Sequence, residues 1–138
     1  MIYINNMSMM GNLIMVVEDE SLLLQAIGKK LQRDGFDVLM CTQAGQAIDY
    51  LKTLEDLPDL IWLDYYLPDM NGGDLLDVIG KNEKWKNIPV VVVSNSASDL
   101  KVQSLLAKGA KRHLLKADHR LDEIVKIIKT FIGKGAKK

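Results

Sequence analysis

The chain has 138 residues, 48% of them hydrophobic, which is enough for one domain with a single core and too little for two. The formal charge is zero, but residues 108–138 carry ten Lys or Arg against three acids, and residues 1–107 carry eight against fifteen. Because the basic residues are scattered without interleaved aromatic side chains, we expect a solvated surface and no nucleic-acid binding.

The first twelve residues, MIYINNMSMMGN, are predicted to be a disordered leader, since they contain neither a basic region nor a long apolar segment. No stretch of the chain approaches the roughly 20 apolar residues that cross a bilayer, so we expect no membrane contact. The single cysteine, Cys41, excludes an internal disulfide, and its place in an apolar run indicates a buried thiol rather than a reactive one. These features favour a cytoplasmic protein.

Apolar segments of strand length alternate along the chain with segments of helical periodicity. The predicted strands span residues 13–17, 38–41, 60–63, 90–93 and 113–115. A helix is predicted after each strand. Thr42 is expected to cap the second helix, and the fourth helix is expected to turn Val102, Leu105 and Leu106 inward. Residues 133–138 are predicted to be a flexible basic tail, which leaves residues 13–132 as the domain.

This alternation predicts the α/β class, because parallel strands need crossover connections and helices supply them. For five such units we expect a flavodoxin-like doubly wound five-stranded parallel sheet with strand order 2-1-3-4-5 and five helices. In such sheets ligands bind at the carboxyl ends of the first and third strands, where the strand order reverses.

Polar residues follow the predicted strands at this edge. Glu18 and Asp19 follow the first strand, Asp64 the third, Ser94 the fourth and Lys116 the fifth. Each has a purely structural explanation when taken alone: a strand end in water, a charge at a helix start, a turn cap or a solvated lysine. Together they predict a site, since three neighbouring carboxylates repel one another unless a hard cation such as Mg²⁺ compensates their charge.

The chain resembles the receiver domain of bacterial two-component response regulators over residues 13–132. The motifs that carry the resemblance are VVEDE at residues 16–20, LDYYLPDMNGG at 63–73, IPVVVVSNSA at 88–97 and GAKRHLLK at 109–116. In this order and spacing they are highly specific. The resemblance implies a phosphorelay protein that catalyses its own phosphorylation and dephosphorylation without being a conventional enzyme.

Residue by residue, the resemblance implies that Asp64 is the phosphoacceptor and that Ser94 and Lys116 hold phosphoryl oxygens. Mg²⁺ would be bound by Asp64, by Asp19 directly and by Glu18 directly or through water. The backbone carbonyl of Tyr66 would be a further ligand.

The resemblance also implies tuning and signalling positions. Tyr66 and Ser96, each two residues after a site residue, are expected to set the lifetime of the phosphorylated state. Ser94 and His113 stand at the switch positions, although His113 replaces the more usual tyrosine or phenylalanine. Lys116 is followed by Ala117 instead of proline, so we expect a trans peptide bond there, because a cis bond without proline costs about 3 to 4 kcal/mol.

The implied partners are a sensor histidine kinase or a histidine phosphotransfer protein, and a downstream protein target. The target would read the face formed by the fourth helix, fifth strand and fifth helix, and the protein would be a monomer or a weak dimer on phosphorylation. No effector domain is apparent after the fifth helix, so we expect either a stand-alone regulator or a receiver cut from a longer protein.

Three alternatives differ in the chemistry that they require. A pseudo-receiver would signal without phosphate, and retention of Asp64, Asp19, Ser94 and Lys116 argues against it. A haloacid-dehalogenase-type phosphatase needs a second acid two residues after the first, where this chain has Tyr66. A flavodoxin-type FMN carrier needs a phosphate loop rich in Ser, Thr and Gly after the first strand, where the acidic residues 18–20 would repel phosphate.

Overall fold

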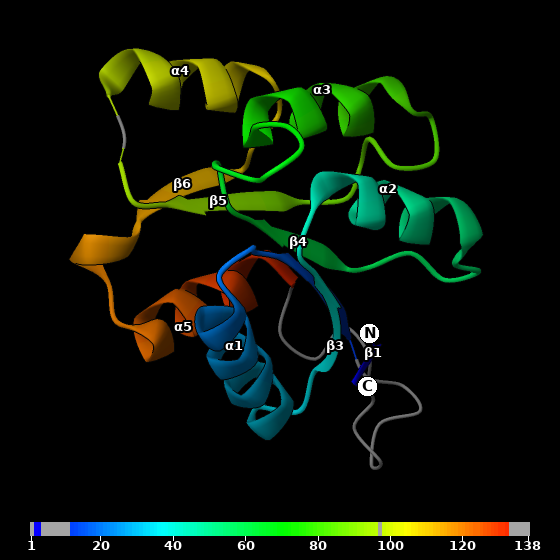
Figure 1. Ribbon diagram of the computed structural model, residues 1–138, viewed down its shortest axis with the longest axis vertical. Coiled ribbons are helices and arrows are strands. Elements are labelled where there is room, and N and C mark those ends of the chain that lie inside the picture. The colour runs from blue at the N-terminus through cyan, green and yellow to red at the C-terminus, as the bar shows by residue number, and fades with distance from the viewer. Residues whose placement is uncertain (1, 4–11, 97, 133–138) are drawn as a thin grey trace.

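The sheet has the predicted strand order and one additional strand. The computed structural model describes residues 2–3, 12–96 and 98–132. Five parallel strands lie in the order β3-β2-β4-β5-β6, which is the predicted order 2-1-3-4-5, and β1 joins at the β3 edge (Figure 1). The strands are β1 (Ile2–Tyr3), β2 (Leu13–Val17), β3 (Asp37–Cys41), β4 (Leu60–Leu63), β5 (Val90–Ser94) and β6 (Arg112–Leu115).

Helices cover both faces of this sheet, as expected of a doubly wound fold. Helices α2, α3 and α4 lie on one face, and α1 and α5 lie on the other (Figure 1). The α-helices of the described chain are α1 (Ser21–Arg33), α2 (Ala44–Thr53), α3 (Gly72–Lys81), α4 (Asp99–Ala107) and α5 (Leu121–Ile132). None of them is both long enough and apolar enough to cross a bilayer.

Strand β4 is buried on both faces, which explains its continuous apolar sequence. Ile61 and Leu63 pack into the core under α2 and α3, whereas Leu60 and Trp62 pack into the core under α1 and α5. Successive side chains of a strand point to opposite faces, so a central strand of a doubly wound sheet has no polar side. Asp64 directly follows this strand, at its carboxyl end.

The start of α2 differs from the prediction. The helix begins at Ala44, and the cap comes from Asp69 in the β4–α3 loop rather than from Thr42. The Asp69 carboxylate accepts the backbone N–H groups of Ala44 at 3.0 Å and Gly45 at 2.7 Å. Thr42 instead donates its own backbone N–H to Gln46 Oε1 at 2.8 Å. A cap supplied from a distant loop leaves no local sequence pattern.

The inward face of α4 is narrower than predicted. Leu105 is 1% exposed and belongs to the core, whereas Leu106 is 42% exposed, so the prediction that Leu106 faces inward is wrong. Neighbouring residues on a helix point about 100° apart, and α4 has few apolar residues to show which side is buried.

Strand β1 lies within the segment predicted to be a disordered leader. Ile2 and Tyr3 pair antiparallel with Leu39 and Val38, so at these two residues the structure differs from the prediction. The reason is that β3 would otherwise be an edge strand with unpaired backbone groups, and Ile and Tyr both have high strand propensity. Residues 1 and 4–11 of the predicted leader and the predicted tail at 133–138 lie outside the described residues. Asn12, the last residue of the predicted leader, is described, and its backbone carbonyl accepts the N–H of Asp37 at 2.9 Å.

Candidate functional site

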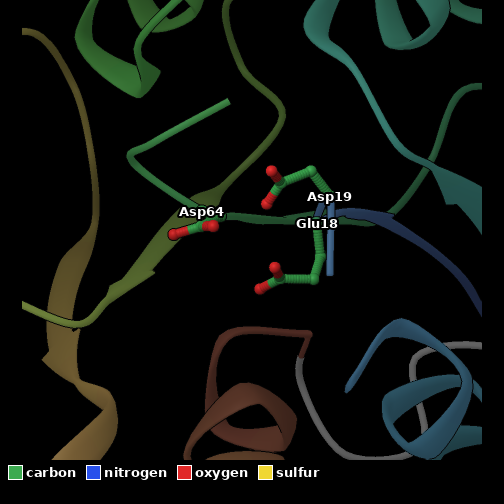
Figure 2. Close-up of side chains that lie close together, drawn as sticks. All are labelled: Glu18, Asp19 and Asp64. Carbon is green, nitrogen blue, oxygen red and sulfur yellow. The ribbon is translucent and has the colours of Figure 1, made fainter. Parts of the chain in front are cut away.

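Three carboxylates meet at the carboxyl ends of β2 and β4. These strands are neighbours, with Val17 paired with Leu63, so Glu18 and Asp19 leave one strand beside Asp64 leaving the other. One carboxylate oxygen from each of the three residues lies within 4.8 Å of the other two. The carboxyl groups of Glu18 and Asp19 both point to the side on which Asp64 lies (Figure 2). We call these three residues the acidic cluster.

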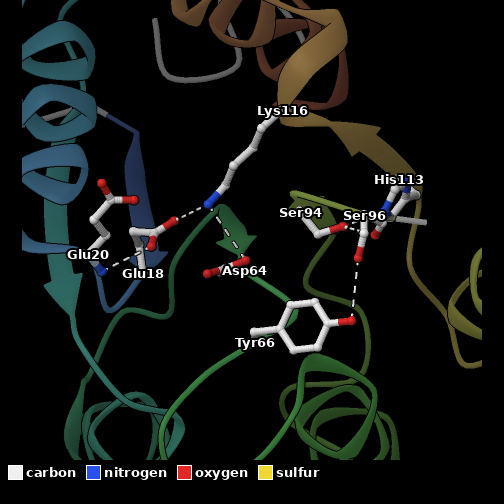
Figure 3. A network of polar contacts seen from close by, with 8 residues as sticks. All are labelled: Glu18, Glu20, Asp64, Tyr66, Ser94, Ser96, His113 and Lys116. Atoms are coloured by element: carbon white, nitrogen blue, oxygen red, sulfur yellow. Dashed lines mark hydrogen bonds and ion pairs between the residues drawn. The ribbon is translucent and has the colours of Figure 1, made fainter.

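Lys116 lies between two members of the acidic cluster. It follows β6 as the first residue of a 3₁₀ turn (Lys116–Asp118), and its bond to Ala117 is trans, as predicted. Its Nζ is 2.8 Å from Glu18 Oε1 and 3.8 Å from Asp64 Oδ1, as Figure 3 shows. This ammonium is the compensating charge for two carboxylates that are almost fully buried, Glu18 at 1% and Asp64 at 5% exposed.

Burial and crowding alter the acidity of Asp64. Desolvation raises its pKa to about 7, the neighbouring charge of Glu18 adds to the increase, and Lys116 opposes it. One positive charge therefore does not fully compensate the three carboxylates. The acidic cluster has the charge and the oxygen donors that suit a hard divalent cation, which supports the predicted fit of Mg²⁺.

Ser94 is fully buried at the end of β5, and its hydroxyl points away from Asp64, toward Ser96 and His113 (Figure 3). Its hydroxyl donates to the backbone carbonyl of Ser96 at 2.8 Å, and His113 Nε2 lies 2.8 Å from the same Ser94 oxygen. A serine hydroxyl has one proton, so the geometry assigns the second hydrogen bond to an Nε2–H donor on His113. Burial, and next the charge of Lys101, lower the His113 pKa and favour the neutral ring.

The side chains of Tyr66 and Ser96, which were predicted to tune the phosphorylated state, lie close to each other. The Tyr66 hydroxyl is 3.4 Å from Ser96 Oγ (Figure 3). It also accepts a hydrogen bond from Lys101 Nζ at 2.6 Å, which lowers the pKa of the Tyr66 phenol. Lys101 could not be identified from the sequence, because it lies on α4 outside every recognised motif. Its contact with Tyr66 depends on how α4 packs against the sheet.

The loop after Asp64 is held close to α3. The N–H of Gly72 donates to the Tyr65 carbonyl at 2.6 Å, and a Cβ at Gly72 would lie 3.1 Å from the Asp64 carbonyl oxygen. A side chain at this position would therefore displace the backbone of the phosphoacceptor candidate. The backbone of Tyr66, whose carbonyl was predicted to bind the metal, pairs with Asn71 in an isolated β-bridge.

This fold and these side chains define a doubly wound α/β domain with an acidic, cation-compatible site at its switch point. The family model of the response regulator receiver domain matches residues 14–129, and the chain belongs to that family. The resemblance on which the sequence analysis relied is thereby confirmed.

Named relatives agree with this assignment. The chain is 33% identical over 113 residues to the two-component response regulator ARR14 of Arabidopsis thaliana, covering 82% of this chain and 29% of the relative. It is 32% identical over 120 residues to the putative two-component response regulator ARR21 of the same plant, covering 87% of this chain and 19% of the relative. The chain thus spans less than a third of these two relatives. The chain is also 31% identical over 103 residues to the two-component response regulator ORR8 of Oryza sativa subsp. indica. This match covers 75% of this chain and 84% of the relative.

Solved structures share the fold over most of the chain. The crystal structure of the phosphorylated cyanobacterial phytochrome response regulator RcpA superimposes with a TM-score of 0.80 at 27% identity, covering 91% of this chain and 96% of that one. The signal receiver domain of a putative LuxO repressor from Vibrio parahaemolyticus gives a TM-score of 0.79 at 25% identity, covering 88% of this chain and 90% of that one.

Proposed function

We propose that this receiver domain accepts a phosphoryl group on Asp64 from the phosphohistidine of a sensor histidine kinase or a histidine phosphotransfer protein. The observation that carries the proposal is the position of Lys116 Nζ, 2.8 Å from Glu18 and 3.8 Å from Asp64, inside a cluster of three carboxylates. A carboxylate attacks phosphorus readily only when the charge on the transferring group is neutralised nearby. This site brings the nucleophile and a cation together.

In the transfer step an Asp64 carboxylate oxygen forms a bond to phosphorus while the bond from phosphorus to the donor imidazole nitrogen breaks. The leaving nitrogen keeps the electron pair, so no oxidant or reductant is needed. The Lys116 ammonium would turn from Glu18 to one phosphoryl oxygen. The Ser94 hydroxyl would turn from the Ser96 carbonyl to a second phosphoryl oxygen. Catalysis would come mainly from positioning and electrostatic stabilisation.

The residues that would hold Mg²⁺ are Asp19 and Asp64, Glu18 directly or through water, and the Tyr66 backbone carbonyl. When bound, Mg²⁺ would neutralise charge on the phosphoryl oxygens during transfer and hydrolysis. Glu18 already accepts hydrogen bonds from Lys116 on Oε1 and from the Glu20 backbone N–H on Oε2. These two contacts fix the orientation of its carboxyl group before any cation arrives.

Signalling would use the hydrogen bond between Ser94 and His113. When the Ser94 hydroxyl turns toward the phosphoryl group, it gives up the Ser96 carbonyl and alters the surroundings of His113 on β6. The face formed by α4, β6 and α5 would then change, and a downstream protein would bind it. The similarity to RcpA, a response regulator of the same fold that was crystallised in its phosphorylated form, supports the phosphorylation on which this signalling step depends.

The test is incubation with Mg²⁺ and a small acyl phosphate, followed by intact mass. We expect a phosphate-sized mass gain in the wild type that is absent from Asp64→Asn and abolished by a chelator. Asp56→Asn, which changes an exposed carboxylate in the α2–β4 loop, is the matched control and should gain the same mass as the wild type.

The pseudo-receiver alternative predicts a different outcome. A wild type that gains no mass from the acyl phosphate, or from a phosphorylated histidine phosphotransfer protein, would favour signalling without phosphate. Labelling that persists in Asp64→Asn would place the phosphoryl group elsewhere on the chain.

A further inference from the structure

We propose that Lys101 is a positioning residue that holds the Tyr66 side chain beside Asp64 and thereby lengthens the lifetime of the phosphorylated state. This inference rests on the proposed phosphorylation of Asp64. It assigns a role to a residue on α4 that is not part of the acidic cluster.

Two aromatic rings and one hydroxyl surround the Lys101 ammonium. Its Nζ lies 4.2 Å from the centroid of the Tyr65 ring and 4.5 Å from that of the Tyr66 ring, and it donates to the Tyr66 hydroxyl at 2.6 Å. The two rings meet edge to face with centroids 4.9 Å apart. The cation over the Tyr65 ring and its short hydrogen bond to the Tyr66 hydroxyl together require Tyr66 to keep this orientation.

Tyr66 has few other restraints. It is 52% exposed, and its remaining side-chain hydrogen bond, to Ser96 Oγ, is long at 3.4 Å. An exposed tyrosine ring exchanges rapidly between side-chain conformations unless its neighbours prevent it. Lys101, anchored on α4, therefore supplies the main restraint that keeps the ring beside Asp64 within the described part of the chain.

The position of this ring matters for hydrolysis of the acyl phosphate. Water must approach phosphorus opposite the Asp64 oxygen. A bond from water to phosphorus forms, the bond from phosphorus to the Asp64 oxygen breaks, and both protons of the water leave on the released phosphate. Tyr66 lies next to Asp64 with its hydroxyl toward Ser96 (Figure 3), so the held ring borders the path of that water. Releasing the ring opens the path and speeds the loss of phosphate.

The experiment phosphorylates each variant with Mg²⁺ and a small acyl phosphate, removes the donor and follows the decay by intact mass. We expect Lys101→Met to decay about three to ten times faster than the wild type, in line with the loss of one exposed cation–π contact and one hydrogen bond. Tyr66→Leu should decay at a similar rate, and the double variant no faster than either single one. Lys101→Arg should stay close to the wild type, because Arg can make both contacts.

A matched control lies at the other end of the same helix. Lys108 pairs with Asp77 at 2.9 Å and ties α4 to α3 without touching Tyr66. Lys108→Met should therefore decay at the wild-type rate. A decay as fast as that of Lys101→Met would show that loosening α4 is sufficient, which would overturn the proposed role of Lys101.

A second measurement tests the contact without phosphate. Ring currents from Tyr65 and Tyr66 should displace the NMR signals of the Lys101 ε-protons from their values in the unfolded chain, and Tyr66→Leu should change that displacement. If the wild type takes up no phosphoryl group, both proposals are wrong, whatever the NMR result. If it is phosphorylated but Lys101→Met decays at the wild-type rate, this inference alone is wrong.

Discussion

The burial of the Asp64 carboxyl group beside Glu18 has a cost to the stability of the fold. Burial, then the charge of Glu18, raise its pKa to about 7 from 3.8. At a pH between these two pKa values the folded protein binds more protons than the unfolded chain, so the free energy of unfolding falls as the pH rises. Above about pH 7 the whole of this destabilisation is present. A charged Asp64 therefore destabilises the metal-free fold.

Replacing Asp64 with asparagine should relieve this cost. In metal-free buffer at about pH 8, we expect Asp64→Asn to raise the free energy of unfolding by about 1 to 3 kcal/mol, and the gain should shrink as the pH falls toward about 4. Urea denaturation of both proteins across this pH range is the measurement. The exposed control Asp56→Asn should change little, and a gain independent of pH would exclude a titrating Asp64 as its cause.

Cys41 illustrates burial acting on a group with no role in the site. Its side chain is fully buried at the end of β3, and desolvation raises the pKa of its thiol to about 12. Because the thiolate is the reactive form, we expect labelling by a thiol reagent at about pH 8 to be at least roughly a hundredfold slower in the native protein than in denaturant. Fast labelling of the native protein would show that β3 opens at this edge.

At the scale of elements, the β4–α3 loop organises its neighbours. Asp69 from this loop caps α2 through Ala44 and Gly45, so the loop that begins at Asp64 also fixes the start of a helix that packs on β2 and β3. Desolvation of Asp69 acts against ionisation, but the N–H groups of Gly45 and Ala44 prevail and lower its pKa. The cap is therefore charged at neutral pH.

Removing this cap should destabilise the fold. We expect Asp69→Ala to lower the free energy of unfolding by about 0.5 to 2 kcal/mol, and Asp69→Asn by less, because asparagine can still accept a hydrogen bond. Chemical denaturation at neutral pH measures both. The depressed pKa implies that the difference between Asp69→Ala and the wild type declines as acid protonates Asp69. Thr42→Ala is the control, and a larger effect there would restore Thr42 as the cap.

The strands and their order could be predicted because the signals are local or topological. Buried central strands such as β4 have continuous apolar sequences, and right-handed crossovers leave few arrangements for five of them. The position of each site residue after a strand follows from the same reasoning. Features that depend on packing could not be predicted, because they leave no periodic pattern in the sequence. Examples are the cap from Asp69, the exposure of Leu106 and the position of Lys101 against two tyrosines.

At the scale of the whole molecule, the site joins the two ends of the domain. Lys116 and Glu18 are 98 positions apart in sequence, yet their side chains meet at 2.8 Å. The acidic cluster itself combines the carboxyl ends of β2 and β4, so a ligand bound there contacts segments that separate on unfolding. Such a ligand stabilises the folded state as a whole, in proportion to its preference for that state.

Magnesium should therefore stabilise the entire domain in the absence of any phosphodonor. At a free Mg²⁺ concentration ten times the dissociation constant, we expect a gain of about 1.4 kcal/mol in the free energy of unfolding, or roughly 4 °C in melting temperature. Asp19→Asn should lose most of this gain, because it removes an exposed carboxylate of the acidic cluster while leaving the buried contact between Lys116 and Glu18 intact. Thermal melts in MgCl₂ and in NaCl of equal ionic strength separate specific binding from screening. Equal shifts in the two salts, or an unchanged Mg²⁺ response in Asp19→Asn, would contradict a metal site built on these carboxylates.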